Sequence, residues 1–235
     1  NLEQAQLCLS RVFDAELARQ AQVEGVRYLP LSSTECAQAN RLKQTLIDNL
    51  NVQARMLPRF TPQRFELSIE PGQAIDYAGV RLMGRVDRID IDAEHGHYVV
   101  IDYKGGIAGH DAGFDPDEQE GFRIPSKIQT LIYAQALRGV VESARPVGAL
   151  YLSYRANEPA RSIAGSFDSS MLNVTGFARS ASGVNMNFES YLDMVELEVG
   201  KRIADFLEGD IVRFSENGQL QFYGWVFTKS KNRWG

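Results

Sequence analysis

The chain has 235 residues, which is enough for one sizeable core, so a single principal domain with a helical addition is expected. Hydrophobic residues make up 44% and charged residues 23%, a balance typical of a globular protein, and no apolar run approaches the ~20 residues that would cross a membrane. The net charge of -5 argues against a general polyanion binder, because nonspecific affinity for nucleic acids comes mainly from Lys and Arg.

Cysteine usage points to a reducing compartment. Only Cys8 and Cys36 occur, without a second pair, so the sequence encodes neither a disulfide framework nor a zinc site of the CxxC type. We therefore expect a cytoplasmic location. The chain begins at Asn1 without a leader-like segment, which suggests a piece of a longer protein.

The first part of the chain, residues 1–58, is expected to be a helical segment that precedes the core. Apolar residues recur at roughly helical spacing, and Pro30 followed by Ser32 divides the segment into two helices, with Ser32 as a capping signal. The apolar positions of the first helix are Leu7, Val12, Phe13 and Leu17.

An alternating pattern from Phe60 to Tyr103 predicts three antiparallel strands. The strands are expected over residues 64–69, 80–91 and 97–103, separated by Pro71-Gly72 and by His95-Gly96. They open a core that we place at residues 59–208.

The rest of the core mixes helices and strands. A loop over 105–125 is followed by a helix from Ser126 to about Arg138 and by a strand over 147–155. Residues 160–184 are polar and poor in periodicity, which suggests an insertion with possible short strands, and residues 188–207 are expected to form a long amphipathic helix. Residues 209–235 are expected to be a tail that packs on the core. The fold class is therefore α/β.

Three charged residues form the most informative pattern. Asp87 lies in the segment Gly-Arg-Val-Asp-Arg-Ile-Asp at residues 84–90, and Asp102 and Lys104 follow in Asp-Tyr-Lys. Residues two apart on a strand share a face, so Asp102 and Lys104 point the same way while Tyr103 points to the other side. If the two strands pair, Asp87 reaches the same end of the sheet.

Two convergent carboxylates are suited to a hard divalent cation. Mg²⁺ prefers oxygen ligands and keeps several waters, so Asp87 and Asp102, together with backbone carbonyls and phosphate oxygens, suffice to hold it at a phosphodiester. Two such ions, roughly 3.5 to 4 Å apart, stabilise the attacking and the leaving oxygens of an in-line displacement. Lys104 would orient the attacking water and neutralise developing charge, or assist deprotonation.

The alternative for an isolated Asp-x-Lys triplet is an ordinary pair of solvated neighbours on a surface strand. Here the triplet follows the apolar run at residues 98–101, which predicts a central strand. Charges at the end of a central strand need a reason, because burying them without partners is costly. The context therefore favours a functional role.

These motifs resemble the PD-(D/E)XK nuclease superfamily, specifically its RecB-like branch, which includes the AddB nuclease domains. The likeness rests on GRVDRID, VIDYKGG and the later segment KIQTLIY at residues 127–133. It implies a restriction-endonuclease-like core, a central mixed β-sheet flanked by helices. It also implies metal ligation by Asp87 and Asp102, a catalytic Lys104, and catalytic roles for Gln129 and Tyr133 beside the active site.

The chain departs from that family pattern at one metal ligand. The family has an upstream helix whose His or Glu completes the metal shell, and no His precedes His95 here. The ligand lies before Asn1, or a carboxylate replaces it: Glu66 is the candidate, and Glu16 is a weaker one. His95, His97 and His110 are assigned no role.

A second departure concerns the iron-sulfur cluster of AddB-like relatives. That cluster needs a C-terminal Cys-x-x-Cys group, and residues 222–227 contain no Cys. No iron-sulfur cluster is expected. Packing of Tyr223, Trp225 and Phe227 is the hypothesis for how the tail is tethered instead.

The resemblance implies a Mg²⁺-dependent DNA exonuclease, with Mn²⁺ as a substitute ion. DNA ends or single strands would be the substrate, Lys127 and Arg155 would contact phosphates without reading sequence, and a helicase domain or subunit would act beside it. No membrane partner and no small-molecule cofactor are expected. The alternatives are a catalytically silent DNA-end-binding or structural module, and a non-nuclease α/β binding protein.

Overall fold

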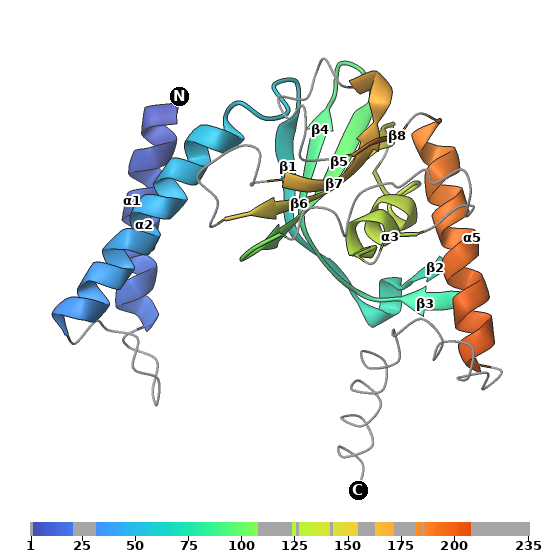
Figure 1. Cartoon of the computed structure of the whole chain (residues 1–235), viewed down its shortest axis with the longest axis horizontal. Coiled ribbons are helices and arrows are strands. Elements are labelled where there is room, and N and C mark those ends of the chain that lie inside the picture. The colour runs from blue at the N-terminus through green and yellow to red at the C-terminus, as the bar shows by residue number, and fades with distance from the viewer. Residues whose placement is uncertain are drawn as a thin grey trace, which may run out of the picture.

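The computed structural model describes residues 2–20, 32–107, 124–125, 127–141, 143–154, 163–171, 182–184 and 186–207. Its centre is a six-stranded sheet in the order β1-β4-β5-β6-β7-β8 (Figure 1). β1–β4, β4–β5 and β6–β7 are antiparallel, whereas β5–β6 and β7–β8 are parallel, so the sheet is mixed. The strands are β1 (Thr61–Ile69), β4 (Gly84–Asp92), β5 (His97–Lys104), β6 (Arg145–Ser153), β7 (Ile163–Asp168) and β8 (Ser182–Val184).

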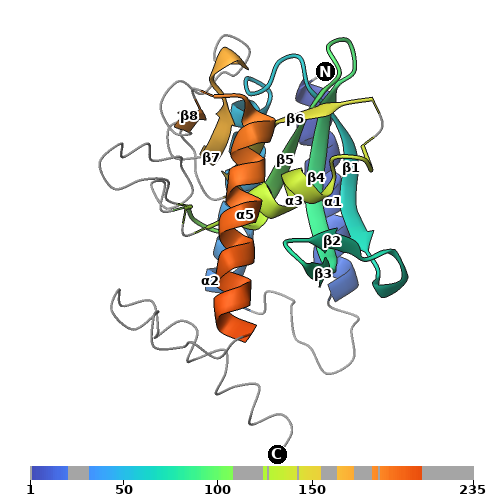
Figure 2. The same cartoon turned by 90° about the vertical axis from the view of Figure 1, so that its right-hand side faces the viewer.

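Helices cover both faces of this sheet. One face packs on α3 (Gln129–Ala136) and α5 (Phe188–Leu207), which stand in front of the strands in Figure 2. The other face packs on the end of α2 (Ser33–Gln53) and the residues after it. The predicted α/β class and restriction-endonuclease-like core, a mixed sheet flanked by helices, are confirmed.

Alternation along β5 assigns its side chains to the two layers. Tyr98 and Val100 are buried with α3 and α5, and Val99 and Ile101 are buried with the end of α2. Because the period of a strand is two, Asp102 and Lys104 continue the first set and Tyr103 continues the second. The expected division of these residues between the two faces is confirmed.

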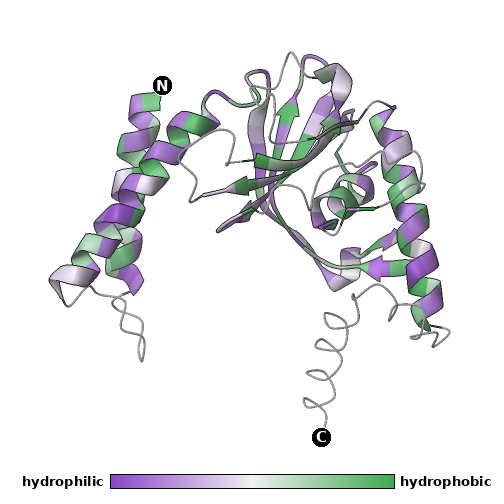
Figure 3. Ribbon diagram, in the orientation of Figure 1, coloured by the Kyte–Doolittle hydropathy of each residue, from purple (hydrophilic) through white to green (hydrophobic). Residues whose placement is uncertain are grey.

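The N-terminal helices form a hairpin beside the sheet (Figure 1). Ser32 caps α2 as expected, with a capping box in which Glu35 bonds back to the Ser32 N–H at 2.9 Å. α1 (Leu2–Gln20) has no buried residue, and Figure 3 shows hydrophilic stretches along both helices. Contacts such as Lys43 to Asp14, at 2.7 Å, join the two helices.

The strand expected over residues 80–91 is divided in the structure. Ala78 and Gly79 both have positive φ values, 49° and 80°, and form the turn between β2 (Ile75–Tyr77) and β3 (Val80–Leu82). These two short strands pair as a separate sheet after a 3-10 turn, η1 (Pro71–Gln73), and β4 starts afresh at Gly84. The apolar alternation continues across Met83, so the pattern alone did not reveal the break.

The segment expected as an insertion, residues 160–184, contributes to the main sheet. β7 pairs with β6 and β8 pairs with β7, with a 3-10 turn, η3 (Ser169–Met171), after β7. All six residues of β7 are buried. A strand covered on both faces need not alternate, and small residues such as Gly165 and Ser166 mask its apolar character.

The helix expected from Ser126 begins at Gln129 instead. Ile128 occupies the N-cap position and its side chain makes no capping hydrogen bond. Ser126, most of the loop at 105–125 and the tail at 209–235 lie outside the described residues. The long helix expected over 188–207 is confirmed as α5. Within the described ranges, no helix combines the length and the apolarity that a membrane crossing requires.

Candidate active site

The two motif carboxylates meet where the β4–β5 ladder ends. The last paired residues are Arg88 and Ile101, and continuing that register places Asp87 opposite Asp102. The Oδ2 atom of Asp87 accepts a hydrogen bond of 2.8 Å from the main-chain N–H of Tyr103. This contact joins the two strands one step beyond their regular pairing.

Asp102 is a buried charge, with only 4% of the residue exposed. Burial raises the pKa of this carboxyl above its usual range; Lys104 opposes the shift and the nearby charge of Asp87 adds to it. The site therefore concentrates negative charge in a region with little solvent. A cation placed between the two carboxylates would offset both the desolvation cost of the buried carboxylate and the repulsion between the two negative charges.

Lys104 supplies the positive charge of the site. Its Nζ lies 2.5 Å from Oδ2 of Asp102 and donates a hydrogen bond of 3.3 Å to Oε1 of Gln129. The ammonium also stands 5.7 Å from the centre of the Tyr151 ring, within the range of a cation–π contact. Three groups from three different elements thus fix the end of this side chain.

Tyr151 is a member of the site that the sequence reasoning missed. It pairs with Asp102 across the parallel β5–β6 ladder, and its hydroxyl accepts a hydrogen bond of 3.3 Å from the N–H of Thr130. It thereby connects β6, Lys104 and the first turn of α3. A parallel pairing of residues 97–104 with 145–153 would have pointed to it, but sequence alone does not give that register.

Gln129 and Tyr133 lie in different environments although they are four apart on α3. Gln129 is exposed and reaches Lys104. Tyr133 is 8% exposed, and a Cβ added to Gly84 would stand 2.6 Å from its hydroxyl oxygen. The structure therefore brings Gln129 to the carboxylate–lysine group and places the Tyr133 hydroxyl against the main chain where β4 begins.

Glu66 is not gathered with the two aspartates. The β1–β4 register places it opposite Asp87, but its φ of 50° breaks the regular strand, and its carboxylate binds Arg85 at 2.8 Å. Among the residues that the structure describes, no three His, Cys, Asp or Glu side chains cluster as a metal-binding group. In this arrangement Glu66 serves an exposed ion pair.

The other upstream candidate and the histidines lie elsewhere. Glu16 on α1 accepts hydrogen bonds from Arg19 and Gln20, and the Arg19 guanidinium leads in lowering the pKa of this carboxyl to about 2. His95 and His97 flank the β4–β5 turn, at the opposite end of these strands, where Nδ1 of His95 lies 3.0 Å from Asp92. His110 lies outside the described residues.

The predicted phosphate-contacting residues are only partly placed. Lys127 is half-buried two residues before α3, and Arg155 lies outside the described residues. Arg88, which the sequence puts near the site, has a side chain only 13% exposed and holds Asp90 through two hydrogen bonds of 2.6 Å. It is bound within the fold and is not free for a phosphate.

Surface shape does not identify the site. An open cavity of about 850 Å³ lies at the other end of the sheet, lined by residues such as His95, Arg138, Arg145 and Glu189. None of the predicted site residues lines it. We assign the candidate site from its chemistry, the convergence of Asp87, Asp102, Lys104 and Gln129.

The carboxylate pair fits a hard divalent cation. Asp87 and Asp102 offer oxygen donors at one sheet edge, and Mg²⁺ requires few protein ligands because it retains water. The raised pKa of Asp102, caused first by burial, shows that its negative charge is only partly compensated by Lys104. These two residues are the ones that would hold the ion.

Comparison with known proteins agrees with this geometry. A sequence model of the PD-(D/E)XK nuclease superfamily matches residues 1–171, which include both carboxylates, Lys104, Gln129, Tyr133 and Tyr151. A search of curated proteins finds no match.

Proposed function

Because the chain belongs to the PD-(D/E)XK nuclease superfamily, whose members are generally nucleases, we propose that it is a Mg²⁺-dependent DNA exonuclease domain that uses two metal ions. The observation that carries the proposal is the buried Asp102, which lies opposite Asp87 and 2.5 Å from the Lys104 ammonium. A carboxylate pair can hold the metal ions of a phosphodiester hydrolase, and an adjacent ammonium can neutralise charge that develops in the reaction.

Each side chain of the site has a distinct task in this proposal. Asp87 and Asp102 hold Mg²⁺, or Mn²⁺ in its place, and the bound ions supply positive charge for the attacking and leaving oxygens. Lys104 orients the water and neutralises charge that develops on the phosphorus oxygens. The Oε1 atom of Gln129 accepts a hydrogen bond of 3.3 Å from the Lys104 ammonium and so helps to hold it beside the substrate.

The Lys104 ammonium lies 2.5 Å from the Asp102 carboxylate and 5.7 Å from the centre of the Tyr151 ring. Orientation of the water and charge neutralisation are the tasks that we propose for it, with assistance to deprotonation as the alternative.

The finer parts of the proposal rest on the motif resemblance. They are a RecB-like or AddB-like subtype, DNA ends or single strands as substrate, phosphate contacts by Lys127 and Arg155, Tyr133 beside the active site, and a helicase domain or subunit acting with the chain in DNA recombination or repair. We also propose a cytoplasmic location, no iron-sulfur cluster, and a division into a helical segment at 1–58, a nuclease core at 59–208 and a tail at 209–235.

A comparison of linear and closed circular DNA tests the proposal. End-labelled linear DNA and a covalently closed circle are incubated with the chain in Mg²⁺, in Mn²⁺ and in EDTA, alongside Asp102→Asn. We expect metal-dependent loss of the linear DNA only, absent in the variant. Cutting of the circle would establish an endonuclease instead. No cutting by a chain that divalent ions stabilise would support the alternative of a catalytically silent DNA-end-binding module.

A further inference from the structure

Arg88 lies on the face of the sheet opposite the candidate site. Its Nε and Nη2 atoms donate to the two oxygens of Asp90, both at 2.6 Å, and the side chains are 13% and 2% exposed. The two residues are two apart on β4 and share a face, which permits this forked geometry. The two residues form a buried ion pair in which both carboxylate oxygens accept hydrogen bonds.

The remaining contacts of the guanidinium reach neighbouring elements. Nη1 donates to Oε1 of Gln53 on α2 and to the hydroxyl of Tyr103 on β5, each at 2.8 Å. Gln53 in turn donates to Asn49 at 2.7 Å, and Asn49 donates to the carbonyl of Ser153 at 2.9 Å. One polar network therefore ties α2, β4, β5 and the end of β6 together.

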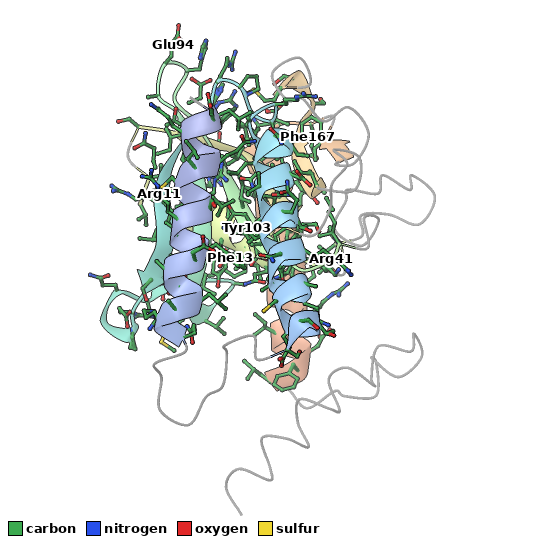
Figure 4. All side chains as sticks on the ribbon, turned by 90° about the vertical axis from the view of Figure 1, so that its left-hand side faces the viewer. Arg11, Phe13, Arg41, Glu94, Tyr103 and Phe167 are labelled. Atoms are coloured by element: carbon green, nitrogen blue, oxygen red, sulfur yellow. The ribbon has the colours of Figure 1, made fainter. Side chains whose placement is uncertain are left out.

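Tyr103 receives contacts on both sides of the sheet. Its ring packs with the residues after α2 and bonds Arg88, and Figure 4, viewed from the side of α1 and α2, labels it behind these helices. Its main-chain N–H bonds the carboxylate of Asp87 at 2.8 Å, on the side of the candidate site. It stands between Asp102 and Lys104 in the sequence.

The separation of the two carboxylates depends on these contacts. β5 is held by β6 as far as Lys104, paired with Ser153, whereas the β4–β5 ladder ends at Arg88 and Ile101. Beyond that point, two hydrogen bonds link β4 to β5: Asp87 accepts one from the Tyr103 N–H, and Arg88 donates the other to the Tyr103 hydroxyl. Loss of the second link leaves the first to set the position of Asp87.

We propose that Arg88 is a positioning residue for the candidate active site: through the hydroxyl of Tyr103 it fixes the segment whose N–H holds Asp87 beside Asp102. The expected effect of Arg88 on kcat rests on the proposed nuclease function. It also explains why an Arg and a second Asp follow Asp87 in the Asp-Arg-Ile-Asp motif, since Asp90 compensates the buried guanidinium.

The experiment removes the link with the smallest change, Tyr103→Phe, which keeps the ring and the pairing of Arg88 with Asp90 and Gln53. The matched control is Tyr98→Phe on the same strand, whose hydroxyl donates to the Ala134 carbonyl at 2.7 Å in the other layer. Tyr103→Phe loses a part-buried hydrogen bond and Tyr98→Phe a buried one, so the control should lose at least as much free energy of unfolding. Arg88→Lys, which cannot form the fork, is the second variant.

Two readouts are compared. With linear DNA in Mg²⁺, kcat falls on the order of ten-fold in Tyr103→Phe while KM stays unchanged, because misplacement of catalytic groups costs rate and not substrate binding. By NMR without DNA or metal, the amide of residue 103 exchanges with solvent faster, again on the order of ten-fold, in Tyr103→Phe and Arg88→Lys, since its bond to Asp87 opens more often. Tyr98→Phe changes neither quantity.

Unchanged exchange at residue 103 in both Tyr103→Phe and Arg88→Lys would overturn the inference, as would an equal loss of kcat in Tyr98→Phe. Faster exchange in a chain that cuts no DNA would uphold the positioning by Arg88 and overturn only the proposed nuclease function. The failure of one proposal is therefore distinguishable from the failure of the other.

Discussion

The carboxylate of Asp87 and the main-chain N–H of Tyr103 are joined by a hydrogen bond of 2.8 Å just past the last β4–β5 pair. This bond brings one carboxylate from β4 beside the buried carboxylate of Asp102 on β5. The site is thus assembled where the regular β4–β5 pairing has stopped.

Divalent ions are expected to stabilise the folded chain through these two carboxylates. Mg²⁺ at ~100 times its Kd adds about 2.7 kcal/mol to the free energy of unfolding, or roughly 5 to 10 °C in Tm for a chain of this size. Asp87→Asn and Asp102→Asn should lose most of this shift in a thermal melt. The control Asp76→Asn, whose side chain is 86% exposed on β2, should keep it; a full shift in both site variants would place the ion elsewhere.

Gly84→Ala is expected to destabilise the fold by about 1 to 3 kcal/mol, because the added Cβ would lie 2.6 Å from the Tyr133 hydroxyl oxygen. Urea unfolding measures the loss. Tyr133→Phe in the same chain removes that oxygen and should recover part of the free energy. Simple additivity of the two substitutions would show that the close approach is not the cause.

Gln129→Ala is expected to lower kcat on the order of ten-fold, because the Lys104 ammonium loses one of the groups that orient it. The residue is exposed, so the free energy of unfolding should change by no more than ~0.5 kcal/mol. Gln129→Glu keeps an acceptor for Lys104 and should retain more activity than the alanine variant. Steady-state kinetics and urea unfolding separate these effects, and an alanine variant as active as the parent chain would exclude this role.

Asp92, at the far end of β4, is expected to make the free energy of unfolding depend on pH in the acid range. Burial acts to raise the pKa of Asp92, but the hydrogen bonds from His95 and the charge of Arg59 outweigh it, so the pKa lies below its usual value. A lowered pKa in the folded state stabilises the chain above the unfolded value of about 3.9, and this contribution is lost as pH falls through the folded pKa.

We therefore expect Asp92→Asn to be about 1 to 3 kcal/mol less stable than the parent chain near neutral pH, where the parent carboxylate is paired. The difference should shrink as pH falls below about 4. Urea unfolding of both chains across that range measures it, and a difference that grows in acid would contradict the sign. Nuclease activity of the variant should persist, because Asp92 lies far from Asp102 along the strands.

The sequence was most informative where chemistry and periodicity coincide. Alternation placed Asp102 and Lys104 on one face and Tyr103 on the other, and the capping signal at Ser32 was correct, because both depend on local rules. The break at Met83 was not visible, because an apolar run can bend. β7 was expected only as a possible short strand within an insertion, because a strand covered on both faces need not alternate.

Contacts that cross the sheet could not be read from the chain. Tyr151 enters the site only through the parallel register of β5 with β6, and Arg88 is bound to Gln53, which is 35 positions away. A basic residue beside an active-site motif reads as a phosphate contact in the sequence. In the structure, the neighbouring Asp90 has already neutralised Arg88.

Single-turnover cleavage of end-labelled linear DNA by the Lys104→Ala chain in excess Mg²⁺ tests the central claim most directly, with Lys201→Ala on α5, whose side chain is 61% exposed, as the surface control. Loss of one preorganised charge at the reacting phosphate predicts a rate lower by roughly 10² to 10³, with unchanged cutting by the control. Cleavage by Lys104→Ala at the rate of the parent chain would contradict the assignment of Asp87, Asp102 and Lys104 as the active centre.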